Sequence, residues 1–191
     1  MMLGALRRAG FQIALSRGPK PRPVIALAMP RAVGVESEAE LADIELADDH
    51  DPALVAERLS SQLPDGVSLI DVRQATGKSA ASLVQRVGYA VEVGEDMDWD
   101  TAASAYARAD EAVVTRTAPD KADKRVDVRS SCAGVQHEPG RLVFDIELSP
   151  TGAARPEEVV QAVAAQIGAT PTMGRIVRTA IVLRDPAGVT L

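Results

Sequence analysis

The tetrapeptide Asp-Ile-Glu-Leu occurs twice in the chain, at residues 43–46 and again at residues 145–148. In both places it lies in a predicted strand that precedes a helix with an early proline, which is Pro52 in the first case and Pro156 in the second. The matching position of the two copies indicates that the two halves of the chain share one architecture. Each half must then bury apolar surface between its own sheet and its own helices.

Hydrophobic periodicity gives the two halves a matching order of elements. In the first half it predicts a short helix that ends at Gly10, strands at 11–15, 24–29, 41–46 and 67–72, and a helix over 51–63 that begins with Asp51 as its N-cap. In the second half it predicts strands at 84–93, 112–117, 126–135, 142–148 and 175–183, and helices that start near Asp98 or Asp100 and at Pro156.

This order is typical of a split β-α-β unit, so we predict an α+β fold with two tandem ferredoxin-like repeats and antiparallel sheets. We place the first repeat at residues 1–77 and the second at 83–185, with a boundary in the small-residue loop 76–82. The first repeat lacks its N-terminal strand, which leaves an unprotected sheet edge. We therefore expect either a chain shortened at its N-terminus or another segment covering that edge, and a homo-oligomer through the edge is one further expectation.

Composition narrows the class of protein. Of 191 residues 46% are apolar but only 3% are aromatic, so the core is expected to consist of Ala, Val, Leu and Ile. The single cysteine, Cys132, excludes an internal disulfide and a cysteine-rich zinc site, and we expect its side chain to be buried. There is no apolar run long enough to span a bilayer and no clear signal peptide, so we expect a cytoplasmic chain without a membrane partner.

Positive charge is concentrated at one end of the chain. The first 35 residues carry six basic and no acidic side chains, whereas the rest carry fifteen basic and twenty-seven acidic ones. Three of the cations, Arg17, Lys20 and Arg22, lie in the loop 16–23, which three prolines stiffen. A stiff cationic loop loses little entropy on binding and could follow phosphates or an acidic protein face. The alternative, a surface turn that balances the acidic remainder, is left open.

The second half has an equivalent charged loop at residues 119–125. If the repeats pack side by side, both loops could line one groove. Neighbouring aspartates neutralise the second loop, which favours a surface turn there. The cations are Lys121, Lys124 and Arg125, and the aspartates in the loop and just after it are Asp120, Asp123 and Asp127.

Several short motifs follow one another in a fixed order. In the first half they are L-R-R-A-G at 6–10, S-x-G-x-x-P-x-P at 16–23, G-V-E-S-x-x-E at 34–40 and D-I-E-L at 43–46. In the second half they are K-R-V-D-V-R at 124–129, Arg155-Pro156 before a helix, and Arg178-Thr179 in the last strand. Their succession over residues 5–184 resembles the radical SAM-associated domain of unknown function, which occurs fused to, or encoded beside, B12-binding radical SAM proteins.

The resemblance implies an accessory role and a B12-binding radical SAM protein as partner, but no defined chemistry and no cofactor. It singles out Ser37 and Glu40, and it matches the family again at Arg129 and Arg178. The chain departs from the family at Pro19 and Lys20, where the family has an aromatic and an asparagine-like residue. A stacking role for this loop is therefore not carried over.

Catalytic and metal sites find little support in the sequence. His50 and His137 are interpreted as exposed loop histidines, and the chain has neither a CxxxCxxC cluster motif nor a phosphate-binding loop. Glu36, Glu38 and Glu40 alternate and could face one side of a strand to hold a cation, although we favour a solvated edge. We therefore predict no catalytic residue and no metal ligand. The candidate binding residues are Arg17, Lys20, Arg22, Ser37, Glu40, Lys124, Arg125, Arg129 and Arg178.

Three functions remain as hypotheses. The first is a non-catalytic accessory domain that docks onto a radical SAM protein or presents its substrate. The second is an RNA-binding module that uses the basic loop, although the net charge of −6 and the scarcity of aromatic residues argue against it. The third, ranked lowest, is a small enzyme that uses the acids near Glu36.

Overall fold

The computed structural model describes residues 2–75, 77–118, 121–150 and 152–184, and these form two compact units. The first unit contains the residues up to Ala28 and those from Leu41 to Ser82. The second contains Met29–Glu40 and the residues from Leu83 onward, so the chain enters the second unit, returns to the first and crosses again. Of the predicted segments, the loop at 76–82 begins at Thr76, the loop at 119–125 begins with Pro119 and Asp120, and the second repeat ends at Asp185; these four residues lie outside the described residues.

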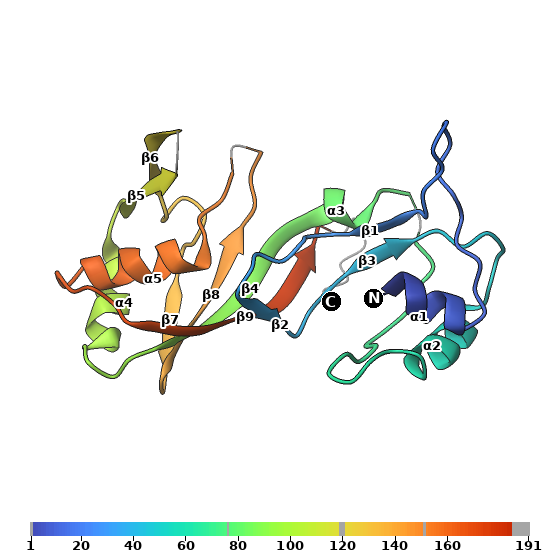
Figure 1. The fold of residues 1–191 in the computed structure, drawn as a ribbon. Helices are drawn as coiled ribbons and strands as arrows, with labels where there is room; N and C mark the ends of the chain where they lie inside the picture. The colour runs from blue at the N-terminus through green and yellow to red at the C-terminus, as the bar shows by residue number, and fades with distance from the viewer. Residues whose placement is uncertain (1, 76, 119–120, 151, 185–191) are drawn as a thin grey trace. The chain divides into compact units, whose positions relative to one another are not determined.

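The first unit is built from short elements (Figure 1). Its helices are α1 (Met2–Arg8) and α2 (Pro52–Ser60), and the short helix α3 (Ala80–Leu83) stands at the boundary between the units. Strands β1 (Ile25–Leu27) and β3 (Ala42–Ile44) form an antiparallel pair. The core of this unit consists of Ala5, Leu6, Phe11, Val55 and Leu59.

The second unit contains one five-stranded sheet with the order β2-β9-β4-β8-β7. Every neighbouring pair is antiparallel except β2 and β9, which are parallel. Strands β5 and β6 form a separate two-stranded sheet. The elements are β2 (Val35–Ser37), β4 (Val84–Val93), α4 (Trp99–Arg108), β5 (Val113–Ala118), β6 (Lys121–Asp127), β7 (Val135–Glu138), β8 (Arg141–Glu147), α5 (Pro156–Ala165) and β9 (Met173–Leu183).

Helices begin where their capping residues predict. Asp51 accepts a hydrogen bond from the amide of Ala53 at 3.0 Å, and Pro52 occupies the first turn of α2. Asp98 accepts one from the amide of Thr101 at 3.0 Å at the start of α4. The predicted start of α2 and the capping of α4 by Asp98 are thus confirmed.

One core joins α4 and α5 to a single face of the sheet. Alternate residues of β4 face these helices, so Val87 and Val91 pack with Tyr106 of α4 and Val163 of α5. Cys132 lies in the same core and is fully buried, as the sequence predicts. Segment 29–40 contributes Met29 and Val35 to this core.

Three predicted strands differ from the structure. Residues 11–15 form only isolated bridges at Ile13 and Leu15. Residues 67–72 form no strand; Leu69 and Val72 pack against the first core without pairing in a sheet. Their apolar pattern therefore reports burial rather than strand pairing. The predicted strand 126–135 is interrupted because the Asp127 carboxylate accepts hydrogen bonds from the amides of Ala112 and Arg129 and turns the backbone.

The fold class is mixed α+β, as predicted, but a tandem ferredoxin-like repeat is not confirmed. The first unit has only the β1–β3 pair and isolated bridges such as that between Ile13 and Leu46. Residues 121–125, predicted as a loop, belong to β6. None of the helices in the described ranges is long and apolar enough to cross a membrane.

Gly88 in the centre of β4 provides a test of the packing between β4 and β9. A Cβ atom at this position would lie 2.8 Å from Oγ1 of Thr179 and 3.2 Å from Cβ of Ala180. We expect Gly88→Ala to lower the free energy of unfolding by about 1–3 kcal/mol, because neighbouring side chains must shift. Urea denaturation measures the change. Gly134→Ala, where an added Cβ meets nothing within 4 Å, is the matched control, and an equal effect of both substitutions would contradict the packing described.

Candidate functional site

The basic loop predicted at residues 16–23 is a hydrogen-bonded hairpin. The amide of Ser16 donates to the carbonyl of Arg22 at 2.8 Å, and the amide of Arg22 donates to Oγ of Ser16 at 3.0 Å. Leu15 and Pro23 form an isolated antiparallel bridge at its base. Gly18 has a φ of 129°, a conformation that favours glycine, so it permits the sharp turn. In Figure 1 this hairpin is the blue loop that projects from the first unit.

The three cations of the hairpin are exposed to solvent and can contact an external group. Within the described ranges, the side chains of Arg17, Lys20 and Arg22 make no hydrogen bond or ion pair. The cross-strand hydrogen bonds and the prolines restrict the backbone that carries them. The hairpin therefore presents three uncompensated positive charges on a stiff support, which is the arrangement required to bind an external anionic group at low entropic cost.

The second predicted basic segment has a different structure. Lys124 and Arg125 lie in β6, where they pair with Arg116 and Thr115 of β5. Both residues are exposed. They belong to the second unit, whereas the hairpin belongs to the first.

Arg129 is engaged within the second unit. Its guanidinium donates to the carbonyls of Ala109 at 3.1 Å and of Ala107 at 3.3 Å, and it also bonds the carbonyl of Ala133. It lies 5.3 Å from the centre of the Tyr106 ring, a cation–π distance. Arg129 thus joins the C-terminal end of α4 to the turn before β7.

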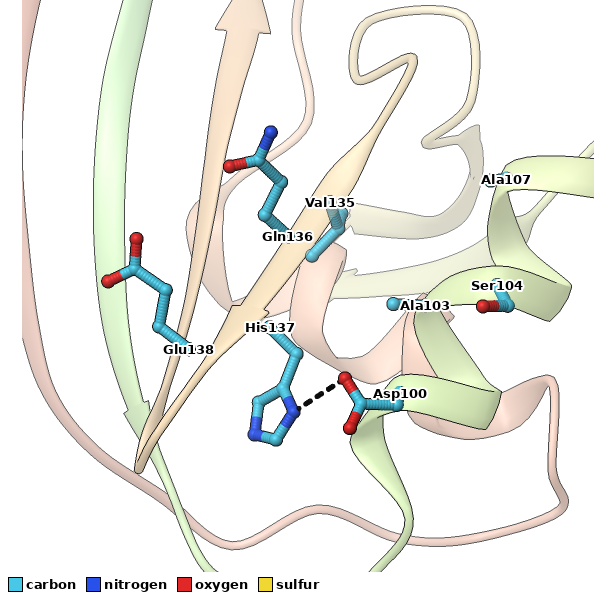
Figure 2. A pocket seen from close by; sticks show the side chains of 8 residues that line it. All are labelled: Asp100, Ala103, Ser104, Ala107, Val135, Gln136, His137 and Glu138. Carbon is cyan, nitrogen blue, oxygen red and sulfur yellow. Dashed lines mark hydrogen bonds and ion pairs between the residues drawn. The ribbon is translucent and has the colours of Figure 1, made fainter.

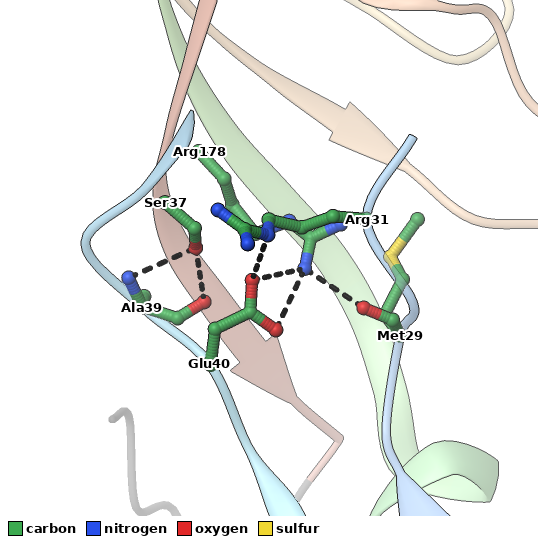
Figure 3. A network of polar contacts seen from close by, with 6 residues as sticks. All are labelled: Met29, Arg31, Ser37, Ala39, Glu40 and Arg178. Carbon is green, nitrogen blue, oxygen red and sulfur yellow. Dashed lines mark hydrogen bonds and ion pairs between the residues drawn. The ribbon is translucent and has the colours of Figure 1, made fainter. Parts of the chain in front are cut away.

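Arg178 comes together in the second unit with Ser37 and Glu40, although 138 positions separate it from Glu40 (Figure 3). The Arg178 side chain is only 1% exposed, and its Nη1 donates to the carbonyl of Met29 at 2.8 Å and to the two carboxylate oxygens of Glu40 at 3.3 and 3.4 Å. Arg31 also approaches Glu40, with Nε 3.4 Å from Oε1. The carbonyl of Arg178 accepts the amide of Glu38 at 2.9 Å.

This cluster fixes segment 29–40 to β9. Glu40 compensates the charge of the buried Arg178, whose Nε has no hydrogen-bond partner among the described residues. Ser37 organises the turn that leads from β2 to Glu40. Its Oγ donates to the carbonyl of Ala39 at 2.9 Å and accepts a hydrogen bond from the amide of Ala39 at 3.2 Å. The contribution of Arg31 is not evident from the sequence, where no periodicity links it to Glu40.

The alternating acids near Glu36 do not share one role. Glu36 pairs with Arg175 at 3.4 Å, whereas Glu40 pairs with Arg31 and Arg178. Only residues 35–37 of this segment are in strand conformation. The structure, over the residues it describes, contains no group of three or more His, Cys, Asp or Glu side chains that could hold a metal ion.

A hollow of about 450 Å³ lies between α4 and β7 (Figure 2). Nδ1 of His137 lies 3.0 Å from Oδ1 of Asp100, and the His137 side chain is 23% exposed. The interpretation of His137 as an exposed loop residue is therefore wrong, because it lies in β7 and faces α4. In a strand, alternate residues share a face, so the apolar Val135 two positions before His137 could have indicated that His137 faces the helix.

His50 is exposed, as expected. Its ring contacts the ring of Phe11 edge-on, with the two ring centroids 5.0 Å apart.

Comparison with known proteins gives one family. The model of a family described as "Uncharacterized protein conserved in bacteria (DUF2344)" matches residues 1–161. No curated protein matches the chain.

The contribution of the Glu40 carboxylate to stability can be tested by substitution. We expect Glu40→Gln to lower the free energy of unfolding by about 1–3 kcal/mol, because it leaves the buried guanidinium without a negative charge. Arg31→Ala removes a side chain that is 48% exposed, and we expect it to cost less than about 0.5 kcal/mol. Urea denaturation of both variants measures the difference. A loss of unfolding free energy in Glu40→Gln that is no larger than the loss in Arg31→Ala would contradict the dependence of Arg178 on Glu40.

The buried thiol of Cys132 should make the free energy of unfolding depend on pH. Burial raises the pKa of its thiol from the ordinary 9.0 to about 11, so the folded state retains the proton when the unfolded state has lost it. This contribution to stability is complete below pH 9 and is lost as the pH rises toward 11. Denaturation of the wild type and of Cys132→Ala across this range should show a steeper decline for the wild type. Identical slopes would contradict the shift.

Proposed function

The chain belongs to the family of uncharacterized proteins conserved in bacteria, and from this premise we propose that it is a non-catalytic accessory domain that docks onto a partner protein through its basic hairpin. The observation that supports the proposal is the presentation of Arg17, Lys20 and Arg22 on one hydrogen-bonded, proline-rich turn. These cations have no counter-charge among the described residues of the chain, so an acidic protein surface would complete them.

The partner that we propose is a B12-binding radical SAM protein. The support for this choice is the ordered succession of motifs at 6–10, 16–23, 34–40 and 43–46, which resembles the domain associated with such proteins. The hairpin itself is the second of these motifs. Docking would place this chain beside the partner's reaction centre, where it could also present a substrate.

We further propose that the second unit is ferredoxin-like. Four of its strands have the order β9-β4-β8-β7, with α4 following β4 and α5 following β8. Such a unit buries one sheet face against its helices. The β5–β6 hairpin is then an insertion between α4 and β7.

The proposal is tested by co-expression with the B12-binding radical SAM protein and purification through a tag on that protein. We expect the wild-type chain to co-purify at low ionic strength and to dissociate as salt rises, because the contact is electrostatic. The triple variant Arg17→Ala, Lys20→Ala and Arg22→Ala should lose at least about tenfold in affinity, from roughly 0.5 kcal/mol or more per charge.

A second triple variant controls for net charge. Arg7→Ala, Arg58→Ala and Lys78→Ala removes three exposed cations of the same unit without touching the hairpin, so it should retain the partner. Equal loss in both variants, or no association of the wild type, would refute the proposal. A labelled single-stranded RNA is titrated in parallel, and hairpin-dependent RNA binding without partner binding would replace the accessory role with RNA recognition.

A further inference from the structure

Strand β7 is an edge strand whose outward groups can be assigned. It pairs only with β8, and the two-residue turn Pro139–Gly140 places Glu138 opposite Arg141. In such a hairpin the residues that flank the turn exchange both hydrogen bonds, and the pattern then alternates along the strand. Val135 and His137 therefore direct their amide and carbonyl groups away from β8. The outer edge offers four backbone hydrogen-bonding groups.

Strand β7 is short and ends in the charged Glu138, but it carries no lysine, proline or bulge along its four residues. Edge strands commonly carry lysine, proline or a bulge that prevents another strand from pairing. The β7 sequence is Val-Gln-His-Glu, and its register with β8 is regular. In the part of the chain that the structure describes, no strand or loop pairs with the outer edge.

Helix α4 forms the other wall of a groove along this edge (Figure 2). The hollow is lined from the helix by Asp100, Ala103, Ser104 and Ala107, and from the strand by residues 135–138. The small side chains of the helix leave space above the strand. An incoming strand could therefore place alternate side chains between β7 and α4.

The negative charge in the groove favours a positively charged binding partner. Two acidic residues, Asp100 and Glu138, line the hollow. Glu138 pairs with Arg141, whereas the Asp100 carboxylate is 83% exposed although it bonds His137. No lysine or arginine lines the hollow. We propose that the groove between β7 and α4 binds an extended basic peptide segment of a partner protein, which adds to the sheet as a strand. This inference is independent of the basic hairpin, which lies in the other unit.

The test uses a fluorescein-labelled peptide of about eight residues in which valine and arginine alternate, a length that suits a strand. Fluorescence anisotropy should show saturable binding to the full chain. Two control peptides separate the contributions: one is N-methylated on alternate amides, and the other has glutamate in place of arginine. We expect at least about tenfold weaker binding of each, because the first cannot pair with the edge and the second is repelled by Asp100.

Variants of the chain locate the site. Ala107→Trp fills the groove at an exposed helical position and should abolish binding, whereas Thr117→Trp adds the same bulk on exposed β5 and should not. Asp100→Asn should weaken binding about threefold to fivefold, the range of an exposed ion pair, and Glu111→Gln, outside the groove, should have no effect. Thermal melting verifies that each variant is folded.

Three results would overturn the proposal. The first is equal affinity for the parent and the N-methylated peptide, which would exclude strand addition. The second is retention of binding by folded Ala107→Trp, which would place the peptide elsewhere. The third is a dimer in analytical ultracentrifugation that Ala107→Trp dissociates, which would show that a second copy of the chain occupies the edge.

Discussion

The buried guanidinium of Arg178 is the interaction on which the attachment of segment 29–40 to the second unit depends. It joins the last strand to segment 29–40 through the carbonyl of Met29 and the carboxylate of Glu40. The Arg178 side chain is only 1% exposed, so its charge is costly to bury without the Glu40 carboxylate, and this favours the attachment of the segment to the strand. The parallel pairing of β2 with β9 and the burial of Val35 hold the same segment in place.

The two units have hydrophobic cores of different size. The second unit has one continuous core beneath α4 and α5, whereas the first has a small core and a single β1–β3 pair. The surfaces proposed to bind partners lie away from Arg178 in sequence and differ in chemistry. The hairpin at 16–23 offers positive charge on a stiff backbone, whereas the β7 edge offers backbone hydrogen bonds beside the exposed Asp100 carboxylate of α4. The first favours an acidic surface, and the exposed Asp100 carboxylate at the second favours a basic strand.

Local signals predicted local structure well. The proline and aspartate at the start of α2, the cap of α4 and the apolar run of β4 each determine an element through residues close in sequence. The parallel β2–β9 pair and the Arg178–Glu40 contact join residues more than a hundred positions apart, which periodicity in one sequence does not reveal. Residues 67–72 show the converse, because their apolar pattern reports packing against the first core without strand pairing. The Asp-Ile-Glu-Leu repeat likewise lies in β3 and at β8 but does not give two equivalent sheets.

The central structural claim is that segment 29–40 is an integral part of the second unit. Amide hydrogen exchange at Glu38 tests it most directly, because this amide donates to the carbonyl of Arg178 at 2.9 Å. The account predicts that Glu38 exchanges as slowly as the paired amides of β9 around Val177 and opens with the same free energy. Exchange of Glu38 at the rate of an unstructured peptide, while the β9 amides remain protected, would contradict it.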